Sequence, residues 1–172
     1  PDGAYLYVAG GDPPQVAVFS RDAGTGELTA VEVDPIERLA APVSAVAVSP
    51  DGANVYVAIA GANAVVVFTR DTITGALTFL EAQRGGLVKG IDGASGLVVS
   101  PFLPDGGKYV YVSGAADAAL AVFARDATQA GRLRFLEVDD KSMLRTGELL
   151  GGNPLERVTD VAVSPDGHCV YA

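Results

Sequence analysis

One turn sequence recurs along this chain, and its recurrence constrains the fold more than any other feature. Pro-Asp-Gly begins at Pro1, Pro50, Pro104 and Pro165. Each of the first three turns is followed by an apolar run with a tyrosine, a second apolar run, an Arg-Asp pair and a Gly-x-Leu turn. Because many independent positions recur together, the chain is built from repeats of one supersecondary unit.

Each repeat divides into four short apolar runs separated by turn residues, which is the pattern of four strands joined by hairpins. In the second repeat this pattern predicts strands over 45–49, 54–59, 64–70 and 77–83. Their apolar residues do not alternate with polar ones, so we expect both faces of the sheet to be buried. Four strands in about 50 residues, covered on both faces by neighbouring sheets, are typical of a β-propeller blade.

We therefore predict an all-β fold, a β-propeller fragment with four-stranded antiparallel blades, of which about three are covered. The predicted division is a partial blade over 1–40, complete blades over 41–90 and 91–153, and a partial blade over 154–172. Since propellers close into rings of about four to eight blades, we expect further blades of the same chain. These residues alone are expected to form an open arc that self-associates.

The repeated side chains are interpreted as structural. The predicted core consists of strand residues, namely Val46, Val48, Val57, Val66, Phe68, Phe19, Phe123 and Val163. The repeated Arg-Asp pairs are expected to close the hairpin between the third and fourth strands, through hydrogen bonds and a weak surface ion pair. His168 is expected at an exposed hairpin tip, and Cys169 as a packing residue at the start of a strand.

Charge and composition limit the partners. The formal charge is −9, from 21 acidic and 12 basic residues. A nucleic-acid binder carries clustered lysine and arginine that displace counterions from phosphate, and no such cluster occurs, so neither nucleic acid nor a membrane surface is expected. Cys169 is the one cysteine, which permits no internal disulfide or thiolate cluster. We expect no cofactor and no metal centre.

Nonrepeating polar residues occur in the connections that lead into the first strand of a blade. Asp160 begins such a strand where other repeats have alanine or glycine, so we expect it at the mouth of the central channel. Asp92, Glu156 and Arg157 lie in equivalent connections. We predict that these four residues bind a ligand in a polar pocket, the alternative being a solvated loop. Oxygen ligands of this kind suit Ca²⁺, but their spacing matches no known calcium loop, and no catalytic residue is assigned.

The run 46–58, followed by 65–71 and 74–78, resembles the YVTN-type repeats of lactonase-like β-propellers. That family includes seven-bladed 6-phosphogluconolactonases and secreted bacterial repeat proteins, so the resemblance implies an extracytoplasmic location, periplasmic or secreted. The enzymes of the family tend to carry a Pro-Arg-His-type segment before the first strand of a blade. None of the three equivalent segments here contains histidine, and only Arg157 offers a cation in a comparable place.

Three hypotheses for function remain. The leading one is a noncatalytic extracytoplasmic propeller that binds a protein or glycan, or serves as a scaffold, because repetition is strong and no unique catalytic set is present. The alternative is a lactonase-like hydrolase of a sugar lactone, of the 6-phosphogluconolactonase type, whose site lies in blades outside this segment. A redox or metal propeller is disfavoured by the scarcity of histidine and cysteine. Fold alone does not choose among them.

Overall fold

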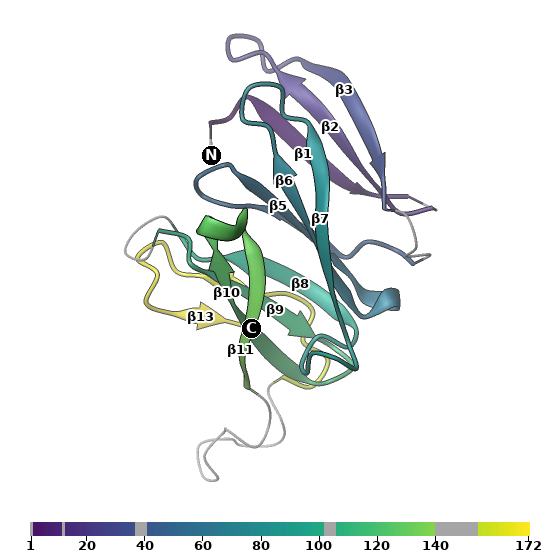
Figure 1. Cartoon of the computed structure of the whole chain (residues 1–172), viewed down its shortest axis with the longest axis vertical. Coiled ribbons are helices and arrows are strands. Elements are labelled where there is room, and N and C mark those ends of the chain that lie inside the picture. The colour runs from purple at the N-terminus through teal and green to yellow at the C-terminus, as the bar shows by residue number, and fades with distance from the viewer. Residues whose placement is uncertain (1, 12, 37–40, 102–105, 140–154) are drawn as a thin grey trace.

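The computed structural model describes residues 2–11, 13–36, 41–101, 106–139 and 155–172, and within these ranges its strands form four antiparallel sheets (Figure 1). The first sheet contains β1 (Tyr5–Gly10), β2 (Gln15–Arg21) and β3 (Leu28–Pro35). The second contains β4 (Ala45–Val48), β5 (Asn54–Ile59), β6 (Ala64–Arg70) and β7 (Leu77–Arg84). The third contains β8 (Ala94–Val99), β9 (Tyr109–Gly114), β10 (Ala119–Asp126) and β11 (Arg132–Asp139). The fourth contains β12 (Ala162–Val163) and β13 (Val170–Tyr171).

Two four-stranded antiparallel sheets and a match to a propeller family, given below, confirm the predicted all-β propeller fragment. Single 3-10 turns, η1 (Ala60–Ala62) and η2 (Ala127–Gln129), are the helical elements of the described ranges. None of the described helices is long and apolar enough to span a bilayer. In the second sheet, the middle strands span the predicted residues, while β4 ends one residue early and β7 runs one residue further.

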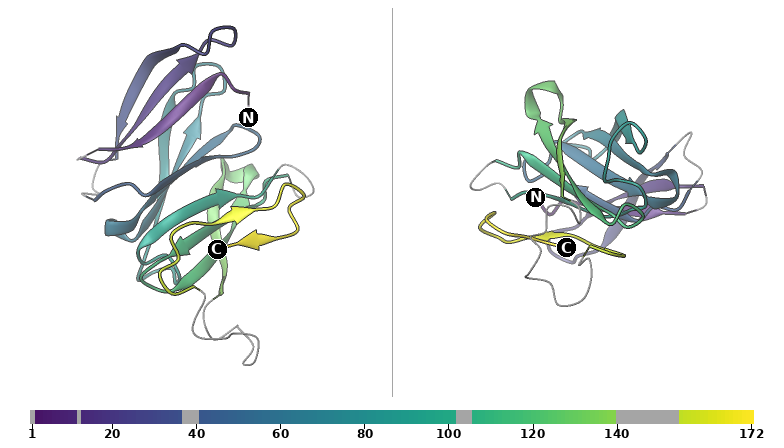
Figure 2. Two further views of the ribbon diagram at one scale, coloured as in Figure 1. Left: turned by 180° about the vertical axis from the view of Figure 1, so that it is seen from behind. Right: turned by 90° about the horizontal axis from the view of Figure 1, so that it is seen from below.

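The sheets pack face to face in a row (Figure 2). β1 contacts β4, β4 and β5 contact β8, and β8 contacts β12. One apolar cluster lies between the first and second sheets, and another lies between the second and third. β1 pairs only with β2 within the described ranges, so residues 161–164 do not close the row onto it.

Half of the predicted core residues are fully buried. Val57, Val66, Phe68 and Phe123 are buried, and each lies in one of the two clusters between sheets. The remaining predicted residues are only partly buried, namely Val46, Val48, Phe19 and Val163. Both buried phenylalanines sit on the third strand of a sheet and meet the fourth strand edge to face, with ring centroids 6.2 and 5.9 Å from Phe79 and Phe135.

A β-bulge recurs between the last two strands of each of the first three sheets. The register shifts at Val18/Phe19, Val67/Phe68 and Val122/Phe123. A bulge re-aims the side chains beside it. In the bulged strands, Glu32 accepts a hydrogen bond from the Leu77 N–H (2.7 Å), and Glu81 accepts one from the Leu133 N–H (2.8 Å). Each glutamate thereby joins its own sheet to the next.

A second set of contacts between sheets uses the repeated arginines, and we call it the Arg–Tyr–Asp latch. Arg125 on β10 donates to Asp51 (2.6 Å) in the β4–β5 turn and to the Tyr56 hydroxyl (3.0 Å) on β5. The Tyr56 hydroxyl in turn donates to the Gly131 carbonyl (3.0 Å), in the turn after β10. The latch therefore links the third and second sheets by hydrogen bonds that are donated in both directions.

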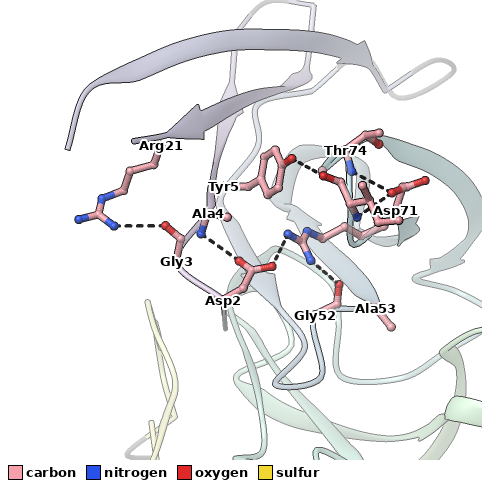
Figure 3. A network of polar contacts seen from close by, with 12 residues as sticks. Asp2, Gly3, Ala4, Tyr5, Arg21, Gly52, Ala53, Asp71 and Thr74 are labelled. Carbon is pink, nitrogen blue, oxygen red and sulfur yellow. Dashed lines mark hydrogen bonds and ion pairs between the residues drawn. The ribbon is translucent and has the colours of Figure 1, made fainter. Parts of the chain in front are cut away.

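The same latch joins the second sheet to the first. Arg70 on β6 donates to Asp2 (2.8 Å), and Figure 3 shows this contact at the Asp2 carboxylate. Arg70 also donates to the Tyr7 hydroxyl, which donates to the Gly75 carbonyl (2.8 Å). Both latch arginines are 6% exposed. Burial acts to lower the pKa of Arg70, but its hydrogen bonds to Asp2 and Tyr7 outweigh burial, so the pKa lies above its ordinary value.

The latch corrects the expectation that each Arg-Asp pair closes its own hairpin. Only the aspartate does so: Asp71 accepts the N–H groups of Ile73 and Thr74, at 2.8 and 2.9 Å. The arginine before it turns to the preceding sheet, because it stands on the opposite face of the strand from the turn contacts. Its ion pair therefore joins two sheets, with the arginine side chain 1% exposed and the aspartate side chain 42% exposed.

The Pro-Asp-Gly turns behave as expected. Gly3, Gly52 and Gly167 have φ of 70°, 72° and 72°, a conformation that glycine adopts without steric cost. His168 lies exposed beside the last turn. Cys169 is also exposed, so its interpretation as a packing residue is wrong. No other described sheet covers β13, whose residues are all exposed.

Candidate functional site

The connections that run from the last strand of one sheet to the first strand of the next lie along one edge of the row of sheets. The connection 85–93 runs from β7 to β8 along this edge. The Gly85 N–H donates to the Asn63 carbonyl (2.7 Å), and the Gly93 N–H donates to the Asn63 side chain (2.8 Å), in the β5–β6 turn. The Ala116 N–H of the β9–β10 turn donates to the Asp92 carbonyl (3.0 Å). We call this the pocket edge; the Pro-Asp-Gly turns lie at the opposite edge.

A cavity of about 310 Å³ lies on the pocket edge, between the connection 85–93 and the β9–β10 turn. Its ionisable lining residues are Lys89, Asp92 and Asp117. Apolar residues complete its wall, with Val138 of β11 on the outer side. The cavity therefore combines one cation and two carboxylates in a small space, which is the composition expected for a site that binds a polar ligand.

Asp117 is held in place by the backbone of the connection. Its Oδ2 accepts hydrogen bonds from the Gly90 N–H (2.8 Å) and the Asp92 N–H (3.1 Å). Its Oδ1 has no hydrogen-bond partner among the described residues, and the side chain is exposed. One oxygen thus fixes the carboxylate while the other remains available to solvent or a ligand.

Sequence reasoning missed Asp117. The signal was present, since the equivalent position of the β5–β6 turn is Ala62, which makes Asp117 a nonrepeating acidic residue in a turn. Its turn follows the second strand of a blade, whereas the residues predicted to form the site lie in connections before the first strand. Hydrogen bonds across 25 and 27 residues of sequence bring the two segments together.

Asp92, a predicted site residue, is half-buried in the same cavity wall. Its Oδ1 is buried and has no hydrogen-bond partner in the part of the chain that is described. The oxygen lies against the backbone of Gly85, where a Cβ atom would collide with it. A buried carboxylate oxygen without a donor is costly, and such atoms are exceptions in folded proteins, which singles out Asp92 as a candidate binding residue.

The other predicted residues form a separate group beside the start of β8. Asp160 packs against Gly96 so closely that a Cβ at Gly96 would meet its backbone. Its Oδ1 accepts the Val161 N–H (2.8 Å), which fixes the carboxylate against the backbone just before β12. Glu156 and Arg157 are exposed in the preceding turn, where Arg157 has a left-handed φ of 62°.

The four predicted residues are thus split between two places on the protein. Among the described residues, no hydrogen bond or ion pair joins Asp92 to Asp160, Glu156 or Arg157. Nor do the described residues contain a group of three or more histidine, cysteine, aspartate or glutamate side chains that could hold a metal ion. The role of the four residues in ligand binding therefore stays a prediction.

Comparison with known proteins places the chain among propellers. Residues 1–137 match the model of a family described as lactonase, 7-bladed beta-propeller. No curated protein matches the sequence. Solved structures that resemble the chain include a periplasmic gluconolactonase from Pseudomonas aeruginosa, at 27% identity and a TM-score of 0.64, over 80% of this chain and 37% of the other.

Two further structures resemble the chain to a similar degree. A putative 6-phosphogluconolactonase from Bacteroides fragilis aligns at 22% identity with a TM-score of 0.68, over 81% of this chain and 37% of the other. A protein from Lactobacillus plantarum aligns at 27% identity with a TM-score of 0.64, over 81% and 39%. The chain spans less than two fifths of the length of each of these three proteins.

Proposed function

The chain belongs to the seven-bladed β-propeller lactonase family, and from this premise we propose that the whole protein hydrolyses a sugar lactone. The reaction adds water across the ring ester: the bond between the carbonyl carbon and the ring oxygen breaks, and a hydroxy acid results. We further propose that the pocket edge of this segment forms part of the ligand-binding surface. The likeness to a periplasmic gluconolactonase at 27% identity supports both the substrate class and an extracytoplasmic location.

The observation that carries the proposal is the cavity that contains Lys89, Asp92 and Asp117. Hydrolysis of an ester needs a base that takes a proton from water and a positive group near the oxygen where negative charge develops. Asp117 suits the role of base, because the backbone fixes one carboxylate oxygen and the other has no partner among the described residues. Lys89 suits the second role, as an exposed ammonium in the same wall.

The proposal is tested by measuring release of acid from gluconolactone and from its 6-phosphate by the complete protein. Asp117→Asn keeps the shape of the side chain and removes the base, so kcat should fall by about a hundredfold or more. Lys89→Met should lower kcat/KM by about tenfold or more. Turnover undiminished in both variants, or no turnover of either lactone by the unaltered protein, would contradict the proposal.

Two matched controls lie away from the pocket edge. Glu27→Gln removes an exposed carboxylate in the turn before β3, and Arg134→Met removes an exposed cation on β11. Both should leave kcat and KM unchanged. If Glu27→Gln lowered activity as much as Asp117→Asn, the effect would reflect overall charge and not a base at the cavity.

A noncatalytic binding or scaffold module is the second candidate function. The repeated arginines, tyrosines and aspartates of the described residues form contacts between sheets. These repeated residues therefore have a structural role and do not form a unique catalytic set, which favours this candidate. The family match supports the lactonase proposal better. Gluconate binding that depends on Lys89, with no turnover of any sugar lactone, would be the result expected of a binding module.

A further inference from the structure

The connection 85–93, which forms part of the cavity wall, is tied at both ends to one residue of the second sheet. That residue is Asn63, which directly precedes β6. The Gly85 N–H donates to its backbone carbonyl (2.7 Å), and the Gly93 N–H donates to its side-chain Oδ1 (2.8 Å). The connection is therefore a closed loop whose two ends meet at a single residue.

The backbone of Asn63 is in the left-handed conformation, with φ of 49° and ψ of 51°. Asparagine tolerates this conformation better than most residues other than glycine. Its amide also supplies a hydrogen-bond acceptor, which glycine lacks. Asparagine thus satisfies the turn and binds the connection at the same time.

The third sheet holds the other side of the same connection. The Asp117 carboxylate accepts hydrogen bonds from the Gly90 and Asp92 N–H groups, as described above. A Cβ atom at Gly93, where φ is 68°, would lie 2.8 Å from a backbone nitrogen of the β9–β10 turn. The last residues of the connection are therefore fitted between turns of two neighbouring sheets, and a shift on one side would disturb the contacts on the other.

Ala118 occupies the position of Asn63 one repeat later, directly before β10. Its φ is 51°, so the turn has the same left-handed conformation there. Alanine has no side-chain acceptor. The turn itself therefore does not need an amide at this position, which points to a role in the connection that the amide binds.

We infer that Asn63 is a positioning residue for the candidate site. By holding the Gly93 end of the connection, it keeps the N–H groups of Gly90 and Asp92 directed at Asp117 and so fixes that carboxylate. The inference takes the site, and the role of Asp117 as base, from the function proposed above. Asn63 does not line the cavity, so it acts through the connection and not on the ligand.

Asn63→Gly in the complete protein tests this role, because glycine keeps the left-handed turn and removes the acceptor. Hydrogen–deuterium exchange of the amides at 90–93 should become at least about fivefold faster, since one contact that holds the segment is lost. For gluconolactone, kcat should fall by at least about fivefold while KM changes by less than about twofold, because a misplaced base affects the transition state more than binding.

Ala118→Gly is the matched control. It makes the same substitution in the same backbone conformation but removes no hydrogen-bond acceptor, so both exchange at 90–93 and kcat should stay unchanged. Equal losses of kcat in the two variants would overturn the inference, because the effect would then come from glycine in the turn.

Two further results would also overturn it: unchanged exchange at 90–93 in Asn63→Gly, or a rise in KM with kcat unaltered, which would mean that Asn63 acts on the ligand. The exchange measurement separates this inference from the proposed function. If the unaltered protein turned over neither gluconolactone nor its 6-phosphate, the proposed function would be wrong. Faster exchange in Asn63→Gly alone would still support the role of Asn63 in holding the connection.

Discussion

Arg125 on β10 and Asp51 in the β4–β5 turn form a 2.6 Å ion pair across two sheets, 74 residues apart in sequence. The arginine side chain is 2% exposed and the aspartate side chain is 32% exposed. The pair is therefore buried at one end and partly solvated at the other. Burial tends to raise the pKa of Asp51, but hydrogen bonds from Ser49 and Ala53 and the contact with Arg125 together hold it below its ordinary value.

Replacing the latch arginine should destabilise the protein strongly. Arg125→Met keeps most of the buried volume but removes the donors to Asp51, Asn54 and Tyr56. We expect the free energy of unfolding to fall by about 3 kcal/mol, measured by urea denaturation. Arg134→Met on the neighbouring strand should change it by less than about 0.5 kcal/mol, because Arg134 is exposed. Equal effects of the two substitutions would contradict the latch.

A carboxyl pair on β3 should make stability depend on pH. Burial, together with the neighbouring Glu32, raises the pKa of Asp34 to about 6, whereas an unfolded aspartate titrates near 3.9. Between about pH 4 and pH 6 the native state therefore binds more protons than the unfolded state, so the free energy of unfolding falls as pH rises through this window. After allowance for solvent screening, the loss is about 1 kcal/mol.

Asp34→Gln should remove that dependence. The equivalent residue of the second sheet is Gln83, whose Nε2 donates to Glu81 (3.2 Å) and to the Leu133 carbonyl (3.1 Å). Glutamine at position 34 should therefore raise the free energy of unfolding at pH 7 by about 1 kcal/mol and flatten its pH profile between pH 4 and pH 7. Urea denaturation at both pH values provides the measurement, with Glu27→Gln as control. A profile that keeps its slope in Asp34→Gln would assign the titration to another group.

The second sheet shows how far sequence reasoning reaches. Its two middle strands span the residues expected, 54–59 and 64–70, because a buried strand is a continuous apolar run with turn residues at each end. The edge strands differ by a residue at one end each. β7 continues to Arg84 because its backbone still pairs with Ala64, 20 positions earlier, and Arg84 itself carries no apolar signal.

Contacts between sheets were harder to predict. The recurrence of Arg70 and Arg125 marks them as structural, but recurrence does not say which blade a side chain faces. A strand residue lies within reach of its own hairpin and of the neighbouring sheet, and only the packing of the blades distinguishes the two. The same holds for the site: Asp92 and Asp117 meet because the connection and the turn lie at one edge, a relationship in space that no spacing in the sequence encodes.

Two turn glycines with the same backbone conformation offer a matched comparison. Gly26 and Gly131 have φ of 77° and 86°, so alanine is strained at both. A Cβ at Gly26 would meet nothing within 4 Å, whereas one at Gly131 would collide with the Asn54 side chain of the preceding sheet. Gly26→Ala should cost about 1 kcal/mol, and Gly131→Ala should cost at least about 1–3 kcal/mol more, through overpacking. Thermal unfolding of both variants tests this; equal losses would mean that the turn does not dock on the second sheet.

The paired phenylalanines of the second sheet should respond very differently to truncation. Phe68 is 3% exposed between the first and second sheets, and Phe79 is 60% exposed on β7. Phe68→Ala should lower the free energy of unfolding by about 3–5 kcal/mol. Phe79→Ala should lower it by about 0.5–1.5 kcal/mol, mainly through loss of the edge-to-face contact. A small effect of Phe68→Ala would contradict the packing of the two sheets.

The Arg–Tyr–Asp latch has a direction: each repeat presents its arginine to the preceding repeat and its aspartate and tyrosine to the following one. A repeat copied in tandem within a gene would meet both of its new neighbours with the correct partner residues already in place. Whole repeats can therefore be gained or lost without inventing an interface, whereas a deletion that removes half a repeat leaves an arginine or an aspartate unmatched. The evolutionary unit of this protein is in that sense the interval from one Pro-Asp-Gly turn to the next.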